Sequence, residues 1–197
     1  MSAALSSISE QKKLEVFKMN KNVLVISTSP RQGGNSDVLA DAFVQGAEAA
    51  GHQVEKVTLR HKTIGFCQGC LACQKTQRCT IKDDANEIVE KMQSAQVLVF
   101  ATPIYYYGMC GQMKTLLDRA NPLYSSEYAF RDVYLLASAA EDEEQTADGT
   151  IRGLSGWIDC FSQAHLAGTV FAGGVDTVGA IKGHPALTQA YELGQRV

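Results

Sequence analysis

The chain has 197 residues, of which 45% are hydrophobic and 20% are charged, and its formal net charge is −3. This composition is ordinary for a globular domain and excludes a disordered, collagen-like or low-complexity chain. The slightly acidic balance argues against nucleic acid as a partner. The length suits one domain that buries about 70% of its unfolded surface, so it needs no disulfide bonds for stability.

The first residues differ from the rest of the chain. We expect residues 1–20 to form an N-terminal extension and residues 21–197 to form the domain. The extension contains Glu10 and Glu15 and lacks the apolar core of a signal peptide. No apolar run reaches the roughly 18 residues that a membrane-spanning helix needs, so we expect no membrane partner. These features predict a cytoplasmic protein with reduced thiols.

Strand-like and helix-like segments alternate along the chain. The predicted strands are 22–28, 53–59, 96–101, 132–138 and 167–174, with 53–59 at an edge of the sheet. The predicted helices are 36–50, 83–94, 110–120, 151–161 and 184–195. Short, continuously apolar strands alternating with helices indicate an α/β fold, in which a doubly wound five-stranded parallel sheet has helices on both faces. In such sheets ligands bind at the carboxyl ends of the strands, so the loops after residues 28, 101 and 138 are the candidates.

The loop after the first strand reads SPRQGGNS (residues 29–36) and leads into a helix. Backbone N–H groups at a helix N-terminus attract an anion, and glycines let it come close. Ser29, Asn35 and Ser36 add short polar side chains, and Arg31 adds a forked cation that suits phosphate. The loop has neither the P-loop pattern nor G-x-G-x-x-G, so a terminal phosphate monoester fits best. The alternative is a polar turn that caps the helix.

The loop after the strand at 96–101 reads PIYYYG (residues 103–108). Its tyrosines offer flat apolar faces with polar tips, which suit an isoalloxazine ring. The alternative is an aromatic patch at a subunit interface, and both interpretations hold if the site lies at a dimer seam. Further along, Lys114 and Asp118 have the i,i+4 spacing of a surface ion pair.

Together with KTLLDR (114–119) and IKGHPALTQAYELG (181–194), these two loops resemble the flavodoxin-like NAD(P)H-dependent FMN reductases, a family that includes the iron–sulfur flavoproteins. The resemblance implies a flavodoxin-like fold, bound FMN and a homodimer or larger homo-oligomer. By resemblance, the phosphate would be held by Ser29, Arg31, Gly34, Asn35 and Ser36. The ring would be lined by Pro103, Ile104, Tyr105, Tyr106, Tyr107 and Gly108. The third loop, 138–142, reads SAAED where this family often has glycines, and only Ser138 is a candidate contact.

Four of the six cysteines lie close together, as Cys67-x2-Cys70-x2-Cys73-x5-Cys79. Thiolates at C-x2-C-x2-C spacing can hold the irons of a [4Fe–4S] cluster, and the spacing is similar to the compact motif of iron–sulfur flavoproteins. The alternative is a loop of free, reactive cysteines without metal. We expect Cys110 and Cys160 to be buried as small hydrophobic residues.

The leading hypothesis is therefore an FMN-dependent oxidoreductase. Electrons would pass from NAD(P)H through the flavin to a small acceptor such as a quinone, a free flavin, a nitro compound or an azo compound. No catalytic side chain is predicted, because the cofactor carries this chemistry. A second hypothesis is an iron–sulfur electron carrier whose cluster, bound by the four clustered cysteines, feeds FMN. A third is a non-enzymatic redox sensor that uses the thiols and the flavin.

Overall fold

The structure is a computed structural model that describes residues 20–197, so the predicted extension lies outside the described residues except for Asn20. The strands are β1 (Asn22–Ser27), β2 (Gln53–Thr58), β3 (Val97–Tyr105), β4 (Gly108–Met109), β5 (Asp132–Ser138) and β6 (His165–Ala172). The α-helices are α2 (Asn35–Ala49), α3 (Cys73–Thr76), α4 (Ala85–Ser94), α5 (Gly111–Arg119), α6 (Asp148–Ile158) and α7 (Pro185–Gln195). The five predicted strands and five predicted helices are all present, with boundaries shifted by a few residues.

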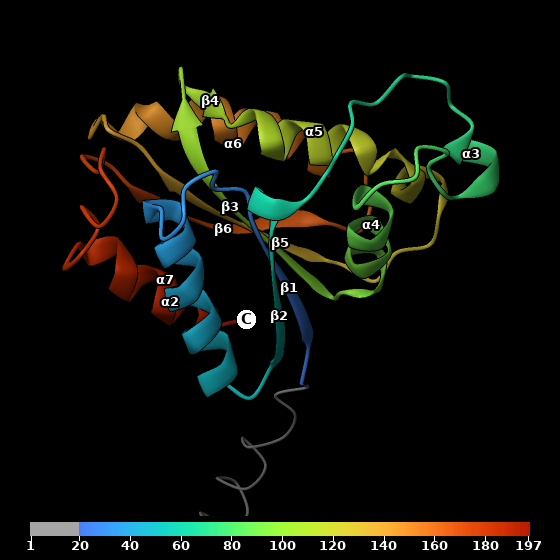
Figure 1. Cartoon of the computed structure of the whole chain (residues 1–197). Helices are drawn as coiled ribbons and strands as arrows, with labels where there is room; N and C mark the ends of the chain where they lie inside the picture. Colours follow the sequence, from blue (N-terminus) through green and yellow to red (C-terminus); the bar gives the residue numbers. More distant parts are fainter. Residues whose placement is uncertain (1–19) are drawn as a thin grey trace, which may run out of the picture.

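The sheet confirms the predicted flavodoxin-like fold. Its parallel strands lie in the order β2-β1-β3-β5-β6, with β2 at an edge as predicted (Figure 1). The chain moves from β1 outward to β2 and then returns to place β3 on the other side of β1. The order therefore reverses between β1 and β3, where the loops at their carboxyl ends diverge and leave room for a ligand.

Helices cover both faces of the sheet (Figure 1). On one face, Leu39 and Phe43 of α2 and Ala190 of α7 pack on the strands. On the other face, α4, α5 and α6 bury a larger apolar cluster that includes Leu116 and Leu154. Burial from both sides explains why the strands read as continuous apolar runs rather than as alternating patterns.

Aromatic rings fill part of the second face. The ring centroid of Trp157 lies 5.9 Å from that of Phe100 and 4.6 Å from that of Phe161. Of the two cysteines expected to be buried, Cys110 is buried. The prediction for Cys160 is wrong: Cys160 is exposed, because it follows the last turn of α6 and lies off its buried face.

The prediction that 103–108 is a loop is also wrong. Strand β3 continues to Tyr105, which pairs with Gly108 of the short antiparallel strand β4. Tyr106 and Tyr107 form the connecting turn, with φ of 48° and 61°. Aromatic residues favour extended backbone, so the strand outruns the sheet and folds back as a hairpin. Left-handed φ values at two tyrosines are uncommon and cost local strain.

Helices α2 and α7 approach each other closely enough for their backbones to touch. A Cβ added at Gly46 would overlap the carbonyl oxygen of Tyr191, and one added at Gly194 would overlap that of Phe43. The two glycines thus set the spacing of this helix pair, which carries both the loop after β1 and the C-terminal segment.

Gly46→Ala should therefore lower the free energy of unfolding by about 1–3 kcal/mol, because the rigid backbone of α7 must move to admit a methyl group. The matched control is Gly156→Ala, which lies on an exposed helix position with no atom within 4 Å of the added Cβ. That change should be neutral or stabilising by up to about 1 kcal/mol. Urea denaturation measures both, and equal effects would contradict the close approach.

Candidate functional site

A cavity of about 220 Å³ opens at the carboxyl edge of the sheet, beside the point where the strand order reverses. Residues from the ends of four strands line it: Ser29, Arg31, Gly34, Asn35, Ser36, Pro103, Ile104, Tyr105, Ser138, Ala139, Ala140, Val175 and Asp176. The structure thus brings the predicted phosphate loop together with the first half of the predicted ring-binding segment. Tyr106, Tyr107 and Gly108 are not part of the wall, and their contact with a ring stays a prediction.

The loop after β1 presents an open helix N-terminus to this cavity. Helix α2 begins at Asn35, and the Gly34 before it supplies no side-chain cap. Ser36 is only 1% exposed, and its hydroxyl has no hydrogen-bond partner within residues 20–197. A buried hydroxyl without a partner is costly, so it indicates a site for a polar ligand. A phosphate group fits this donor set, since Arg31 and the first N–H groups of α2 lie at the same cavity.

Glycine is required at the centre of the loop. A Cβ at Gly34 would overlap the hydroxyl of Ser29, which lies folded back over the loop. The Ser29 hydroxyl donates to the carbonyl of Arg31 at 3.1 Å and accepts from its N–H at 3.2 Å. This turn fixes the loop conformation before any ligand arrives.

Asn35 has a different role from the one predicted for its side chain. Its Nδ2 donates to the carbonyls of Val175 at 3.1 Å and Thr177 at 2.9 Å. Its Oδ1 accepts from the N–H of Ile181 at 3.3 Å. The amide is thereby fully used to hold the segment after β6, so only the backbone N–H of Asn35 is free to face the cavity. Sequence reasoning could not find this role, because the partners lie about 140 residues away.

Arg31 crosses to the same segment. Its Nη1 donates to the carbonyl of Asp176 at 2.8 Å, while the side chain lines the cavity. Val175, Asp176, Ala139 and Ala140 are wall residues that the sequence reasoning missed. The available signal was the position after the last strand, since β6 ends at the same edge as β1, β3 and β5.

An acidic residue in the first turn of α2 is neutralised by a lysine. Asp37 would repel an anion, but Lys56 of β2 lies 2.8 Å from its carboxylate. Burial alone would raise the pKa of Asp37, yet the hydrogen bond and charge of Lys56 outweigh burial and lower it. Burial would likewise lower the pKa of Lys56, and its hydrogen bonds to Asp37 and Asp41 raise it. The pair stays ionised, and the helix N-terminus keeps its affinity for an anion.

The four clustered cysteines line a second cavity, of about 160 Å³, with Asn121 and Ile81 also in its wall. None of the four forms a disulfide: Cys67 and Cys70 are exposed, Cys79 is half-buried and Cys73 is buried. Within the described part of the chain, no three His, Cys, Asp or Glu side chains converge on one metal-ion position. The donor set nonetheless fits a polynuclear cluster, whose thiolates bind separate irons around a volume. Leu71 and Gln77 of this segment have left-handed φ values of 57° and 54°.

A buried guanidinium holds together the two ends of the cysteine segment. The side chain of Arg119 is 0% exposed and lies 2.6 Å from the carboxylate of Asp83. It also donates to the carbonyls of Gly65 at 2.8 Å and Ile81 at 3.2 Å, which are the two ends of the segment. The hydrogen bond to Asp83 raises the pKa of Arg119. Burial would raise the pKa of Asp83, but the hydrogen bonds that the carboxylate accepts from Arg119 and from the N–H groups of Gly65 and Ala85, with the charge of Arg119, together lower it.

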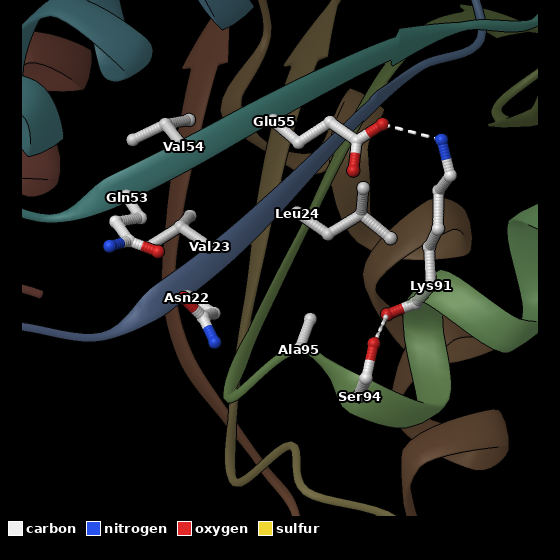
Figure 2. A pocket seen from close by; sticks show the side chains of 9 residues that line it. All are labelled: Asn22, Val23, Leu24, Gln53, Val54, Glu55, Lys91, Ser94 and Ala95. Carbon is white, nitrogen blue, oxygen red and sulfur yellow. Dashed lines mark hydrogen bonds and ion pairs between the residues drawn. The ribbon is translucent and has the colours of Figure 1, made fainter.

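A larger hollow, of about 340 Å³, lies at the opposite edge of the sheet, beside the amino ends of β1 and β2 (Figure 2). Its charged groups are paired with each other, since Lys91 lies 2.6 Å from Glu55 and 2.9 Å from Glu87. It contains none of the predicted site residues and lies away from the ligand-binding edge of the fold. We therefore place the candidate functional site at the carboxyl edge.

As predicted, Lys114 and Asp118 form a surface ion pair, at 2.6 Å.

The sequence and the fold are both similar to those of known proteins. The sequence pattern of the NADPH-dependent FMN reductase family matches residues 21–183. The chain is 28% identical over 173 residues to an iron-sulfur flavoprotein of Archaeoglobus fulgidus, covering 86% of this chain and 75% of that protein. It is 29% identical over 162 residues to an iron-sulfur flavoprotein of Methanosarcina thermophila, covering 82% of each.

A solved structure, the NAD(P)H:quinone oxidoreductase from Methanothermobacter marburgensis, shares the fold. The TM-score is 0.69 at 18% identity, over 90% of this chain and 97% of that one.

Within residues 20–197, no helix is both long enough and apolar enough to span a bilayer. The family pattern covers most of the sequence, including both cavities, and the chain therefore belongs to the NADPH-dependent FMN reductase family.

Proposed function

We propose that this protein is an FMN-dependent oxidoreductase that passes electrons from NAD(P)H to a small acceptor such as a quinone, a flavin, a nitro compound or an azo compound. The observation that carries the proposal is the cavity at the carboxyl edge of the sheet. It joins an open helix N-terminus and the unpartnered Ser36 hydroxyl to an aromatic wall at Tyr105. A phosphate at one end and a flat ring at the other match the two ends of FMN.

At the phosphate end, the chain supplies donors that are already in place. Ser36 and the first N–H groups of α2 face the cavity, and Arg31 adds positive charge. Because Asn35 and Arg31 are bonded to the segment after β6, the loop is held in one conformation before binding. A preorganised site loses little entropy when a ligand binds.

At the ring end, β3 supplies Pro103, Ile104 and Tyr105, and β5 supplies Ser138. Pro103 pairs with Ser138 in the parallel sheet, whereas Ile104 and Tyr105 pair with β4, so strand pairing fixes the position of this wall. When bound, FMN supplies the chemistry of accepting hydride and releasing electrons. The chain's own contribution is to orient the ring and to leave one face open to donor and acceptor.

The cysteine cavity favours a second candidate, an iron–sulfur electron carrier. Four free thiols line one hollow, and the relatives from Archaeoglobus fulgidus and Methanosarcina thermophila are named iron-sulfur flavoproteins. Cys67, Cys70, Cys73 and Cys79 would hold a [4Fe–4S] cluster, which takes up and releases single electrons. The third candidate, a thiol redox sensor, uses the same residues without iron.

We also propose that the protein is a homodimer or larger homo-oligomer. The support is the hairpin of β3 and β4, which carries Tyr106 and Tyr107 into solvent beside the cavity with the side chain of Tyr106 fully exposed. Exposed tyrosines are typical of protein interfaces. A second copy would cover these tyrosines at the side of the cavity and leave a face of the ring accessible to donor and acceptor.

Ser36→Ala should weaken FMN binding by roughly tenfold or more, because it removes a hydrogen bond to a charged group worth about 1.5–3 kcal/mol. It should leave the ligand-free protein as stable as before, since the hydroxyl has no partner there. Ser94→Ala, at the opposite edge of the sheet, is the control. Titration by flavin fluorescence measures the affinities, and equal affinity of Ser36→Ala and wild type would refute the phosphate site.

Anaerobically purified protein should show a broad iron–sulfur absorbance if the second candidate is correct. Cys70→Ser should then lose this absorbance and the iron, whereas Cys160→Ser, which alters an exposed thiol outside the cavity, should keep both. Steady NAD(P)H oxidation by iron-free protein would favour the simple flavin reductase. Reversible thiol oxidation without turnover would favour the sensor.

Tyr106→Ser should dissociate the oligomer and so lower the molecular mass measured in solution. The fold should stay intact, because the Tyr106 side chain is fully exposed in the single chain. Tyr124→Ser, which changes a tyrosine that is 61% exposed elsewhere on the surface, is the matched control. Light scattering coupled to size exclusion measures the mass. If Tyr106→Ser leaves the oligomer unchanged, or if the wild-type protein is a monomer, the hairpin is not part of a subunit interface.

A further inference from the structure

The cavity lined by the four clustered cysteines has an inner and an outer side. Cys67 and Cys70 are exposed, whereas Cys73 is buried and Cys79 is half-buried. The inner pair faces the end of α5 and the short 3-10 helix that follows it, Asn121–Ser125. The protein can therefore act on the electronic properties of this site mainly through Cys73 and Cys79.

A side-chain amide contacts one inner sulfur directly. Asn121 lies in the wall of the cavity, and its Nδ2 donates a hydrogen bond to the Sγ of Cys73 at 3.0 Å. The sulfur belongs to the first residue of α3, and α3 packs against the 3-10 helix that begins at Asn121. This bond therefore fixes both the direction of the Cys73 side chain and the position of its short helix.

A buried cation lies beside the other inner sulfur. Arg119 is held by Asp83 and by the carbonyls of Gly65 and Ile81, so its guanidinium cannot move away. The guanidinium donates to the carbonyl of Ile81, two residues after Cys79, and interacts electrostatically with Cys79. Two residues apart in the sequence, Arg119 and Asn121 thus present a cation and an N–H donor to the two inner sulfurs.

Hydrogen bonds and positive charge at sulfur stabilise the more negatively charged state of a thiolate-bound centre. When such a centre gains one electron and no proton, its charge falls by one unit, so an N–H donor favours the reduced form. We propose that Asn121 is a positioning residue of the cysteine site, which orients Cys73 and raises the reduction potential of the centre that the four thiols hold. The inference rests on the iron–sulfur function proposed above.

The test compares wild type, Asn121→Leu and Asn86→Leu, purified without oxygen and analysed for iron and FMN. Leu has the same branching at Cγ as Asn but no donor. Asn86 is a matched control, because its amide also binds the cysteine segment but donates to the carbonyls of Cys79 and Ile81 rather than to sulfur. The readout is a redox titration followed by visible absorbance, which reports the potential independently of turnover.

In Asn121→Leu, the ratio of reduced to oxidised cluster should fall about tenfold at the potential where the wild-type cluster is half-reduced, a shift of about 59 mV for a one-electron couple. The FMN content and the FMN potential should not change. Asn86→Leu should keep the wild-type cluster potential. Equal shifts in both variants would indicate general loosening of the segment and would overturn the inference.

The remaining outcomes distinguish failure of this inference from failure of the proposed iron–sulfur function. Wild-type protein without iron overturns both, whereas iron-loaded wild type and Asn121→Leu with the same potential overturn the inference alone. If Asn121→Leu assembles no cluster, Asn121→Gln decides, because it keeps the amide. Recovery of the cluster at the wild-type potential supports the donor role, and a cluster at a lowered potential, or none, contradicts it.

Discussion

The pairing of β1 with β3 is the constraint on which the site depends. Five residues of β1 pair in parallel with β3, from Val23 opposite Val97 to Ser27 opposite Ala101. Because this register sets Ser27, the last residue of β1, beside Ala101, the polar loop that follows β1 lies next to the aromatic segment that completes β3. The chain leaves β1 toward β2 and re-enters on the other side as β3, so no crossover helix covers this edge. The cavity is thus a product of topology, and the side chains decide what it can hold.

Much of this arrangement could be predicted from the sequence, because it depends on local patterns. Continuous apolar runs predicted the strands, and the glycines and small polar residues of 29–36 predicted a polar loop at the start of a helix. Tyr105 was correctly placed near the ligand edge, although its backbone continues β3 rather than forming a loop. The turn at Tyr106 and Tyr107 could not be predicted, since tyrosines rarely adopt left-handed φ values.

What could not be predicted depends on contacts between distant segments. The amide of Asn35 resembles a phosphate ligand in the sequence, yet its partners are carbonyls at 175 and 177. Arg119 follows a surface ion pair in a helix and gives no local sign of burial, but Asp83 and both ends of the cysteine segment enclose it. A buried ion pair of this kind is weak evidence for stability, because desolvation offsets its attraction. Its clearest effect is to hold together the two ends of the segment that carries the thiols.

Helix α5 connects the two regions. It begins directly after β4 of the tyrosine hairpin (Figure 1) and ends at Arg119, which hydrogen-bonds both ends of the cysteine segment. Its nine residues correspond to roughly 13 Å of rigid helix. A helix packed on the sheet along its length, through buried residues such as Met113 and Leu116, keeps this separation constant. The distance between the two candidate redox sites is therefore set by secondary structure.

The bonds that Asn35 makes to Val175, Thr177 and Ile181 also bear on how the protein is made. On the ribosome, the loop after β1 emerges long before the segment that braces it, which lies about 140 residues later in the chain. A chain cut before residue 175 would therefore lack the brace.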